Sequence, residues 1–334
     1  MGLSVIIVNY KSCDLILGCL KTIYSSENKN DIEVVVVDND SKDNCEEKLQ
    51  LHYPSVRFYQ MGYNSGFARA NNAGIQIAKG DIILLLNPDT LIINDAVHQC
   101  YLRLRQSNYI AAGVQLLNED KTPQISGNFF MKGGLNHLMA VPYLGSIIRK
   151  LGYLLKVKRT NIPEVSGVAE VDWINGAFLM VKKNAIEKSG MLDEDFFLYS
   201  EEIEWCSRLK KVGHMCVYGD LHVIHLEGSS STIAFGSQGK GYHQLHDKKG
   251  FQVLLSGLLR IRKQFGAGWF LIHFFTYVFA VPFWLIVLLL TSIFRIGTIK
   301  NKWKGWWGYS KNVIKLAKYF FLLLFNRPHF YKAL

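Results

Sequence analysis

The sequence predicts an α/β protein with a mostly parallel sheet covered by helices. Three observations carry this prediction. Within the first 115 residues, short runs that are apolar at every position alternate with stretches whose apolar residues recur at helical spacing. Strands buried on both faces need such runs, and parallel strands need a helix between them. Polar residues also follow directly after several runs, at the edge where sheets of this kind bind ligands.

The expected elements alternate along this half of the chain. The four expected strands span residues 3–8, 32–37, 56–59 and 82–86. The expected helices span residues 15–24 and 66–78, and another begins in DNDSKDNCEEKL after the second strand. Ser41 or Asp43 is expected to cap that helix, because short polar side chains accept hydrogen bonds from the first helical amides.

Three of these strands end on polar residues. Asn9 and Tyr10 follow the first, Asp38 begins the DND that follows the second, and Asn87 and Asp89 follow the fourth, which reads LLLNPDT. Each group alone is explained by capping of the next helix. Three strands ending in this way favour a shared site at the carboxyl edge of the sheet.

The middle of the chain changes character. Residues 135–158 form an amphipathic, basic stretch broken at Pro142. Packing of a helix on its own protein and an interfacial helix near lipid both account for it, and packing is the preferred interpretation. Residues 171–181, VDWINGAFLMV, are strand-like.

An acidic helix is expected within FLYSEEIEWCSRLKKVG, beginning near Ser200-Glu201-Glu202. Glu204 and Arg208 are four residues apart and can form an ion pair on its surface. Ser200 is the expected N-cap of this helix, which gives Glu201 a structural interpretation as part of the helix start. A carboxylate at a helix start among aromatic side chains also has the shifted pKa that a general base needs.

His225 ends a later apolar run, LHVIH. A solitary histidine is more often structural than a ligand. Together with Asp89, however, it supplies a mixed carboxylate and imidazole site that suits Mn²⁺ or Mg²⁺.

Composition limits the classes of function. Apolar residues make up 49% of the 334 residues, which excludes intrinsic disorder, and the net charge is +11. Six scattered cysteines form no disulfide framework or zinc motif and favour a reducing compartment. The N-terminus lacks the features of a signal peptide, so the catalytic part is expected in the cytoplasm. Nucleic acid is not the expected partner, because it leaves the acidic site and the apolar C-terminal part unexplained.

Residues 1 to about 230 resemble an inverting family-two glycosyltransferase with the GT-A fold, within the rhamnosyltransferase-like branch. Six stretches carry the resemblance in the family's order. They are VIIVNYKS, VVVVDNDSKDN, GYNSGFARANNAGI, LLLNPDT, INGAFLMV and LDEDFFLYSEEIEWCSRLKKVGH.

The resemblance implies a role for each matching position. Asn87-Pro88-Asp89 stands where the family has D-x-D, so Asp89 is the implied ligand of the metal on the donor diphosphate, and His225 completes that site in some relatives. Glu201-Glu202 occupies the catalytic acid motif, with Glu202 the first candidate for the base and Glu201 the second. The implied nucleotide-sugar contacts also include Asn9, Tyr10, Asp38, Arg69 and Asn87. Candidates on the acceptor side are Trp173, Gly176 and Tyr199.

The implied function is transfer of a sugar, best matched by rhamnose from dTDP-rhamnose, to a lipid-linked saccharide in cell-surface polysaccharide synthesis. UDP-galactofuranose, UDP-glucose and UDP-N-acetylglucosamine remain alternative donors. An inactive nucleotide-binding scaffold is the alternative from another class. A processive synthase would need several membrane spans and a Q-x-x-R-W-type motif, and neither is visible in the sequence. The oligomeric state is left open, a homo-oligomer included.

The expected domains are a catalytic domain at 1–235 and a helical membrane-associating region at 236–334. The first comprises a nucleotide-binding half, 1–115, and an acceptor half, 116–235. Residues 269–294 carry no formal charge and are long enough to cross a bilayer. Basic residues flank both sides, which opposes a single pass. A kinked hairpin at Pro282 or an in-plane helix are the alternatives, and 312–325 adds an amphipathic helix. Association with the cytoplasmic face of the inner membrane is expected.

Overall fold

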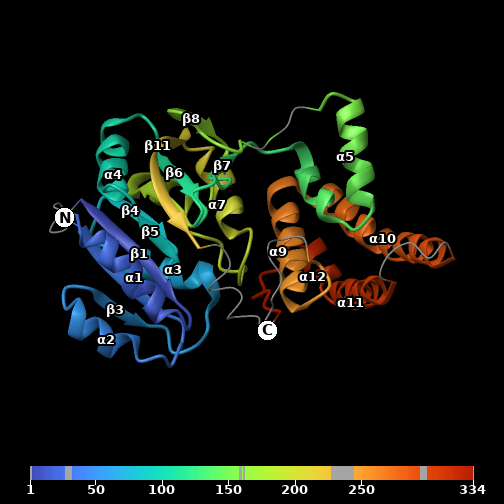
Figure 1. Ribbon diagram of the computed structural model, residues 1–334, viewed down its shortest axis with the longest axis horizontal. Helices are drawn as coiled ribbons and strands as arrows, with labels where there is room; N and C mark the ends of the chain where they lie inside the picture. The colour runs from blue at the N-terminus through green and yellow to red at the C-terminus, as the bar shows by residue number, and fades with distance from the viewer. Residues whose placement is uncertain are drawn as a thin grey trace. The chain divides into compact units, whose positions relative to one another are not determined.

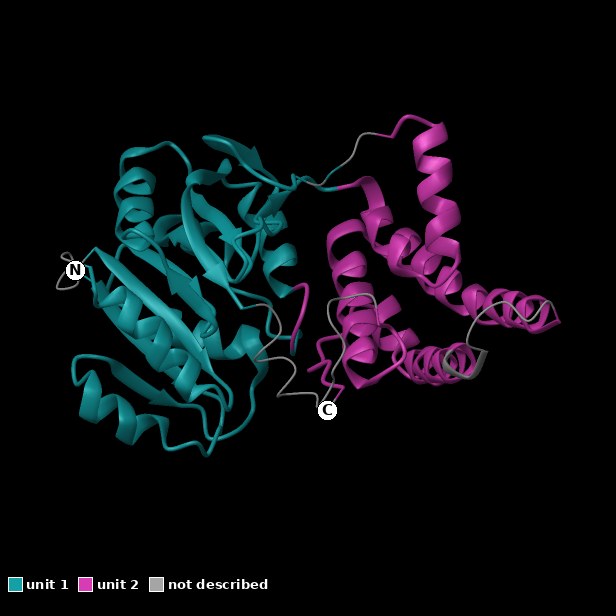
Figure 2. Ribbon diagram, viewed as in Figure 1, with its two compact units in different colours: residues 1–130, 160–197, 201–234 teal, residues 131–159, 198–200, 235–334 magenta. Residues whose placement is uncertain are grey.

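The computed structural model describes residues 2–26, 32–157, 160, 162–226, 244–293 and 299–333. The chain divides into two compact units (Figure 2). Unit 1 comprises residues 1–130, 160–197 and 201–234, and unit 2 comprises residues 131–159, 198–200 and 235–334. Residues 131–159, which the sequence analysis placed in the acceptor half, therefore lie in unit 2 with the C-terminal helices.

Unit 1 contains the sheet and the helices on its faces (Figure 1). Its strands are β1 (Leu3–Asn9), β2 (Ile32–Asp38), β3 (Arg57–Gln60), β4 (Ile82–Leu86), β5 (Thr90–Ile92), β6 (Ala111–Leu117), β7 (Gly127–Asn128), β8 (Val168–Val171), β9 (Trp173–Ile174), β10 (Phe178–Lys182) and β11 (Met215–His225). Its helices are α1 (Cys13–Ile23), α2 (Cys45–His52), α3 (Gly66–Ile77), α4 (Ala96–Gln106), α6 (Lys183–Ser189) and α7 (Glu201–Leu209).

The main sheet of the described residues has nine strands, in the order β3-β2-β1-β4-β10-β6-β11-β5, with β8 paired to β11. The first four strands in this order are mutually parallel, as the sequence predicted. β10 runs antiparallel to both β4 and β6, whereas β11 is parallel to β6. The parallel register places Asn9 beside Asp38, so the ends of β1 and β2 lie at one edge. The α/β prediction is confirmed.

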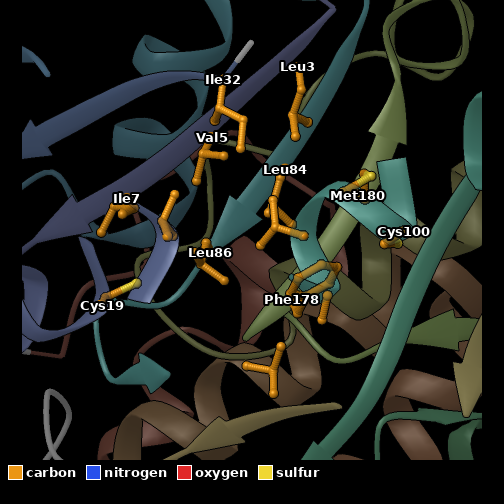
Figure 3. Packing of buried hydrophobic residues seen from close by; sticks show 14 of the residues in the cluster. Leu3, Val5, Ile7, Cys19, Ile32, Leu84, Leu86, Cys100, Phe178 and Met180 are labelled. Carbon is orange, nitrogen blue, oxygen red and sulfur yellow. The ribbon is translucent and has the colours of Figure 1, made fainter. Parts of the chain in front are cut away.

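A hydrophobic core lies on one face of this sheet (Figure 3). Side chains alternate along each strand, so every second residue of β1 and β4 points into it. Leu3, Val5 and Ile7 of β1 pack there with side chains of α1 and α4 such as Cys19 and Cys100. On the other face α3 packs closely: a methyl group at Gly74 would lie 2.4 Å from Cγ2 of Ile6. The helices therefore cover both faces, as a sheet of buried strands requires.

The predicted cap of α2 is wrong. Asn44 precedes the helix in a left-handed conformation and its side chain makes no capping bond. The carboxylate of Asp43 instead accepts from the backbone N–H of Cys13, at the first residue of α1, and from the Asn9 amide. The Asp43 side chain therefore contacts the start of α1 and does not form the cap of α2 that local spacing had predicted.

Unit 2 consists of helices. They are η2, a 3₁₀ segment (Lys132–Ala140), α5 (Leu144–Leu154), α9 (Lys248–Phe265), α10 (Ala267–Ile293), α11 (Ile299–Ala317) and α12 (Phe320–Leu324). α10 packs against both α9 and α11. It runs through Pro282 as one helix, so the hairpin considered at that proline is wrong. The preferred expectation that residues 135–158 pack on their own protein holds for the first part, where η2 packs against α9 and buries Leu138. α5 begins two residues after Pro142 and contacts η2, but it buries only Gly145, so its apolar side is exposed.

Candidate active site at the carboxyl edge of the sheet

The ends of β1 and β2 are joined through the Asn9 side chain. Its Nδ2 donates to Oδ1 of Asp38 at 2.8 Å and to the Asp43 carboxylate at 3.1 Å, while its Oδ1 accepts from Ser12. The second oxygen of Asp38 accepts from the backbone N–H of Ser41 at 3.0 Å. Asn9 and Asp38 are thus both buried and hold the two strand-end loops in a fixed shape. Tyr10 is half-buried, with the Lys11 ammonium 5.7 Å from its ring centre.

The entry into α3 is held by polar contacts to the same edge. Asn39, directly after β2, donates to the carbonyl of Gly66 at 2.9 Å and accepts from the Ser65 hydroxyl at 2.6 Å. Gly66 has φ +75°, and a methyl group there would lie 2.2 Å from the carbonyl oxygen of Phe197. Arg69, one turn into α3, donates from Nε to the Glu194 carbonyl at 3.0 Å. A glycine is therefore required where α3 meets the segment that leads toward the acidic helix.

Asp89 and His225 come together beside the end of β4. β5 pairs antiparallel with β11 and places His225 opposite Thr90, and His225 Nε2 lies 3.5 Å from Asp89 Oδ1. Asn87 Nδ2 is 3.4 Å from the same nitrogen. Asp89 is 4% exposed, and its Oδ1 accepts no hydrogen bond. Since a buried carboxylate oxygen without a donor is costly, this arrangement points to a cation that completes it.

Gln124 fixes the orientation of the imidazole. Its Nε2 donates to the His225 carbonyl and to Asn118 Oδ1, both at 2.8 Å. Its Oε1 is therefore the atom that faces His225 Nδ1, at 3.0 Å, and it accepts the Nδ1 proton. In the neutral ring Nε2 then carries the lone pair, directed toward Asp89 and Asn87. A hydrogen bond to the other ring nitrogen is how proteins orient metal-ligating histidines. Gln124 was not among the residues expected from the sequence, and no local pattern marks it, because it lies in a loop 101 residues from its partner.

These side chains fit a divalent cation that is shared with a ligand. Within the part of the chain that the structure describes, no group of three or more His, Cys, Asp or Glu side chains could hold a metal alone. Asp89 Oδ1 and His225 Nε2 supply two donors, and Asn87 lies beside them. Mg²⁺ and Mn²⁺ take few protein ligands where substrate phosphates fill the remaining positions. The two-donor set therefore agrees with a metal bound together with a diphosphate.

The acidic pair lies at the start of α7, and its two carboxylates differ. Glu201 is 3% exposed and its Oε2 has no hydrogen-bond partner. Burial raises the pKa of Glu201 well above 4.5, and the neighbouring Glu202 raises it further. Glu202 is half-buried and borders the loop before β10: a methyl group at Gly176 would lie 3.3 Å from its Cγ. The protonated form is thus favoured at Glu201, and Glu202 is the more accessible carboxylate.

The rest of α7 is anchored independently of this pair. The predicted ion pair of Glu204 and Arg208 is confirmed, with Nη2 2.8 Å from Oε2. The Trp205 indole donates to the Gly190 carbonyl at 2.8 Å. Tyr199 and Ser200, directly before the helix, have φ values of 73° and 69°, which are uncommon for residues with a side chain. This backbone turns the chain sharply just before Glu201.

A backbone hydrogen bond ties Asn87 to the loop that borders the start of the acidic helix. The backbone N–H of Asn87 donates to the Ala177 carbonyl at 3.0 Å. Gly176, the preceding residue, contacts Glu202, so Asn87 and Glu202 border the same loop. Trp173 lies in β9, which packs against α7, and Tyr199 belongs to unit 2. The structure thus groups Asn9 with Asp38, Asp89 with His225, and Gly176 with Glu202.

Comparisons with known proteins agree with this geometry. Residues 4–151 match the glycosyl transferase family 2 model. It is 30% identical over 215 residues to the low-salt glycan biosynthesis hexosyltransferase Agl10 of Haloferax volcanii, covering 63% of this chain and 62% of the relative. It is 27% identical over 216 residues to the rhamnosyltransferase WbbL of Escherichia coli K12, covering 62% of this chain and 78% of the relative. The match therefore spans less than two thirds of the first relative's length.

The fold has counterparts among solved structures. GalNAc-T7, crystallised with UDP, GalNAc and Mn²⁺, superposes with a TM-score of 0.50 at 13% identity, over 67% of this chain and 43% of the other. This likeness concerns the fold alone. With the family match, it identifies the sheet and helices of unit 1 as the GT-A arrangement.

Proposed function

We propose that the protein transfers a sugar, with inversion, from a nucleotide diphosphate donor to a lipid-linked saccharide at the cytoplasmic face of a membrane. The observation that carries the proposal is Asp89 Oδ1, buried and without a donor, 3.5 Å from the oriented Nε2 of His225 at the carboxyl edge of a family 2 domain. Rhamnose from dTDP-rhamnose is the proposed donor group, supported by relatives named as rhamnosyltransferases.

The proposed site has residues that bind the donor and residues on the acceptor side. Asp89 and His225 would hold Mn²⁺ or Mg²⁺, and the bound ion would supply Lewis-acid neutralisation of the negative charge on the departing diphosphate. Asn9, Tyr10, Asp38, Arg69 and Asn87 form the nucleotide-sugar side of the site. Because the Asn9 and Asp38 side chains are hydrogen-bonded to each other, the loops after β1 and β2 have a fixed conformation before the donor binds. Trp173 and Gly176 of unit 1 are the proposed acceptor-side residues, and Tyr199 stays a candidate from the sequence.

Glu202 is the proposed base. Its carboxylate removes the proton of the acceptor hydroxyl as that oxygen forms a bond to the anomeric carbon. The bond from this carbon to the diphosphate oxygen breaks on the opposite face, and the electron pair leaves with the nucleoside diphosphate. Glu201, whose raised pKa favours its neutral form, adds no second negative charge beside Glu202 in that form.

The test is release of nucleoside diphosphate by the purified full chain with Mn²⁺ or Mg²⁺ and a panel of nucleotide sugars. We expect dTDP-rhamnose to be used preferentially. Asp89→Ala should reduce turnover by about 10²-fold or more, because the variant lacks a proposed metal ligand. The matched control is Asp95→Ala, outside the site. Preference for a UDP-linked donor would replace rhamnose and keep the reaction class. Binding of every donor without turnover would instead favour the scaffold alternative.

A further inference from the structure

Unit 2 has an extreme charge composition. It contains 21 Lys or Arg residues and a single acidic residue, Asp247. Asp247 is engaged within the unit, where its carboxylate accepts from the Gly250 N–H at the start of α9. Unit 1, by contrast, contains 17 Lys or Arg and 26 Asp or Glu. The summed charge of unit 2 therefore attracts an extended anionic surface.

Helix α10 is apolar on two opposite faces. The buried face packs within unit 2 through side chains that include Phe270, Tyr277 and Trp284. The opposite face carries six large apolar side chains that are 49–72% exposed and recur at helical spacing over the whole helix. We call this set the α10 stripe: Ile272, Phe275, Phe279, Ile286, Leu290 and Ile293. A continuous exposed apolar stripe of this length is a contact surface rather than scattered surface residues.

The packing of α10 opposes an orientation across a bilayer. Tyr309 of α11 donates to the carbonyl of Tyr277 at 3.2 Å, and Trp306 donates to that of Val281 at 3.0 Å, so α11 lies along the middle of α10. α11 carries exposed lysines at this level, Lys304 and Lys311 among them. A spanning α10 would draw these charges into hydrocarbon, which is costly.

A non-helical segment that includes Leu245 and Asp247 also lies beside α11. Asn312 of α11 donates to the backbone carbonyls of Leu245 and Asp247 at 2.9 and 2.8 Å. Irregular backbone and the acidic Asp247 therefore lie beside α11 as well, and such segments do not face lipid within the hydrocarbon layer. Although α10 has the length and composition to cross a membrane, its neighbours in unit 2 suit the interface.

Helix α5 supplies a second apolar element with basic neighbours. Ile147, Leu151 and Leu154 lie on one side of it, 44–77% exposed, at spacings of four and three residues. Arg149 and Lys150 are exposed on the same helix. Tyr143, which precedes α5, contacts the Trp284 ring of α10 with 5.8 Å between ring centres, so the start of α5 is attached to α10 within the unit (Figure 1).

We infer that unit 2 binds in the plane of an anionic lipid leaflet, with the α10 stripe and the apolar side of α5 inserted at the level of the headgroups and the lysines and arginines on the lipid phosphates. Apolar insertion supplies the affinity, and the basic residues select anionic lipid. The inference rests on the proposed function for its biological purpose, access to a lipid-linked acceptor, but its evidence lies entirely in unit 2.

The experiment measures insertion depth along the α10 stripe in the full chain. Single cysteines replace Ile272, Phe279, Ile286 and Ile293, each carries a spin label, and the protein is bound to phosphatidylcholine vesicles containing phosphatidylglycerol. The six native cysteines are buried, so the introduced thiol is the accessible one. The outer two positions are about 30 Å apart, because a helix rises 1.5 Å per residue. This distance equals the thickness of the hydrocarbon layer.

The two orientations give different depth profiles. In-plane binding predicts the same shallow depth at all four positions and at a label on Leu151 of α5. A spanning helix predicts shallow labels at the ends and deep labels at 279 and 286, which would overturn the inference. A label at Leu51, an exposed leucine of α2 in unit 1, is the control and should remain in water.

Vesicle binding tests the partner. Serine at Phe275 and Phe279 together should lower vesicle affinity at least tenfold, whereas Leu51→Ser should leave it unchanged. Charge reversal at Arg149 and Lys150 should lower affinity about tenfold only when phosphatidylglycerol is present. Equal binding to neutral vesicles, or a dimer in detergent that the serine variant dissociates, would overturn the lipid assignment. No donor or acceptor is present, so failure here is distinguishable from failure of the proposed reaction.

Discussion

The two units of this protein differ in the sign of their charged residues and in where these residues lie. Unit 1 holds 26 of the 27 acidic residues, and several of them are buried at the carboxyl edge of the sheet. Unit 2 holds more than half of the basic residues and presents apolar helix faces beside them. Buried carboxylates bind cations and move protons, while exposed lysines beside apolar side chains suit lipid. The net charge of +11 is therefore the sum over two unlike parts and describes neither.

This comparison predicts that chemistry and lipid binding respond to different substitutions. The largest effect is expected for Glu202→Gln, which should lower turnover 10²–10⁴-fold because an amide cannot accept the acceptor's proton. Vesicle affinity should not change. The rate of nucleoside diphosphate release with acceptor present measures the first, and flotation measures the second.

Two variants of the same helix sharpen this test. Glu204→Gln removes the ion pair with Arg208 and should retain most of the activity, because that pair only stabilises α7. If Glu201→Gln abolished turnover while Glu202→Gln remained near normal, the base would be Glu201. A loss of vesicle binding by Glu202→Gln would contradict the prediction that catalysis and lipid binding depend on different units.

A smaller effect is expected at Gln124, which we assign as a positioning residue. Gln124→Leu removes the acceptor for His225 Nδ1, so the imidazole loses its fixed tautomer, and Mn²⁺ affinity should fall about 10–100-fold. Gln124→Glu retains an acceptor oxygen and should recover much of the affinity. Titration of free Mn²⁺ by electron paramagnetic resonance measures both without turnover. Unchanged Mn²⁺ affinity in a folded Gln124→Leu variant would show that Gln124 serves only to pack its loop.

The smallest effect concerns the stability of unit 1. The pKa of Glu201 is raised from 4.5 in the folded state, so its contribution to stability is present below that value and is lost as the pH rises through the folded pKa. Glu201→Gln does not titrate. The melting temperature of the variant relative to wild type should therefore increase from pH 4 to pH 8, by a few degrees, at about 2–4 °C per kcal/mol. A difference that is constant with pH would mean that Glu201 ionises normally.

The sequence predicted the parts of the fold that have a local signature. Continuous apolar runs located β1, β2 and β4 to within a residue or two, since burial on both faces leaves no other pattern. The ion pair of Glu204 and Arg208 followed from helical spacing. The predictions that were wrong have one feature in common. Asp43, Pro282 and the side of α5 were each assigned from local rules, and contacts elsewhere in the structure decided otherwise.

The sequence by itself determined the alternation of strands and helices and the polar residues that follow the strands. It could do so because these features depend on neighbours within one turn or one strand. Only the tertiary structure decided that Gln124 orients His225 toward Asp89, that Glu201 is buried while Glu202 is half-buried, and that α10 has one packed face and one exposed face. Each depends on groups brought together from distant positions, and burial and hydrogen bonding between such groups leave no periodic trace along the chain.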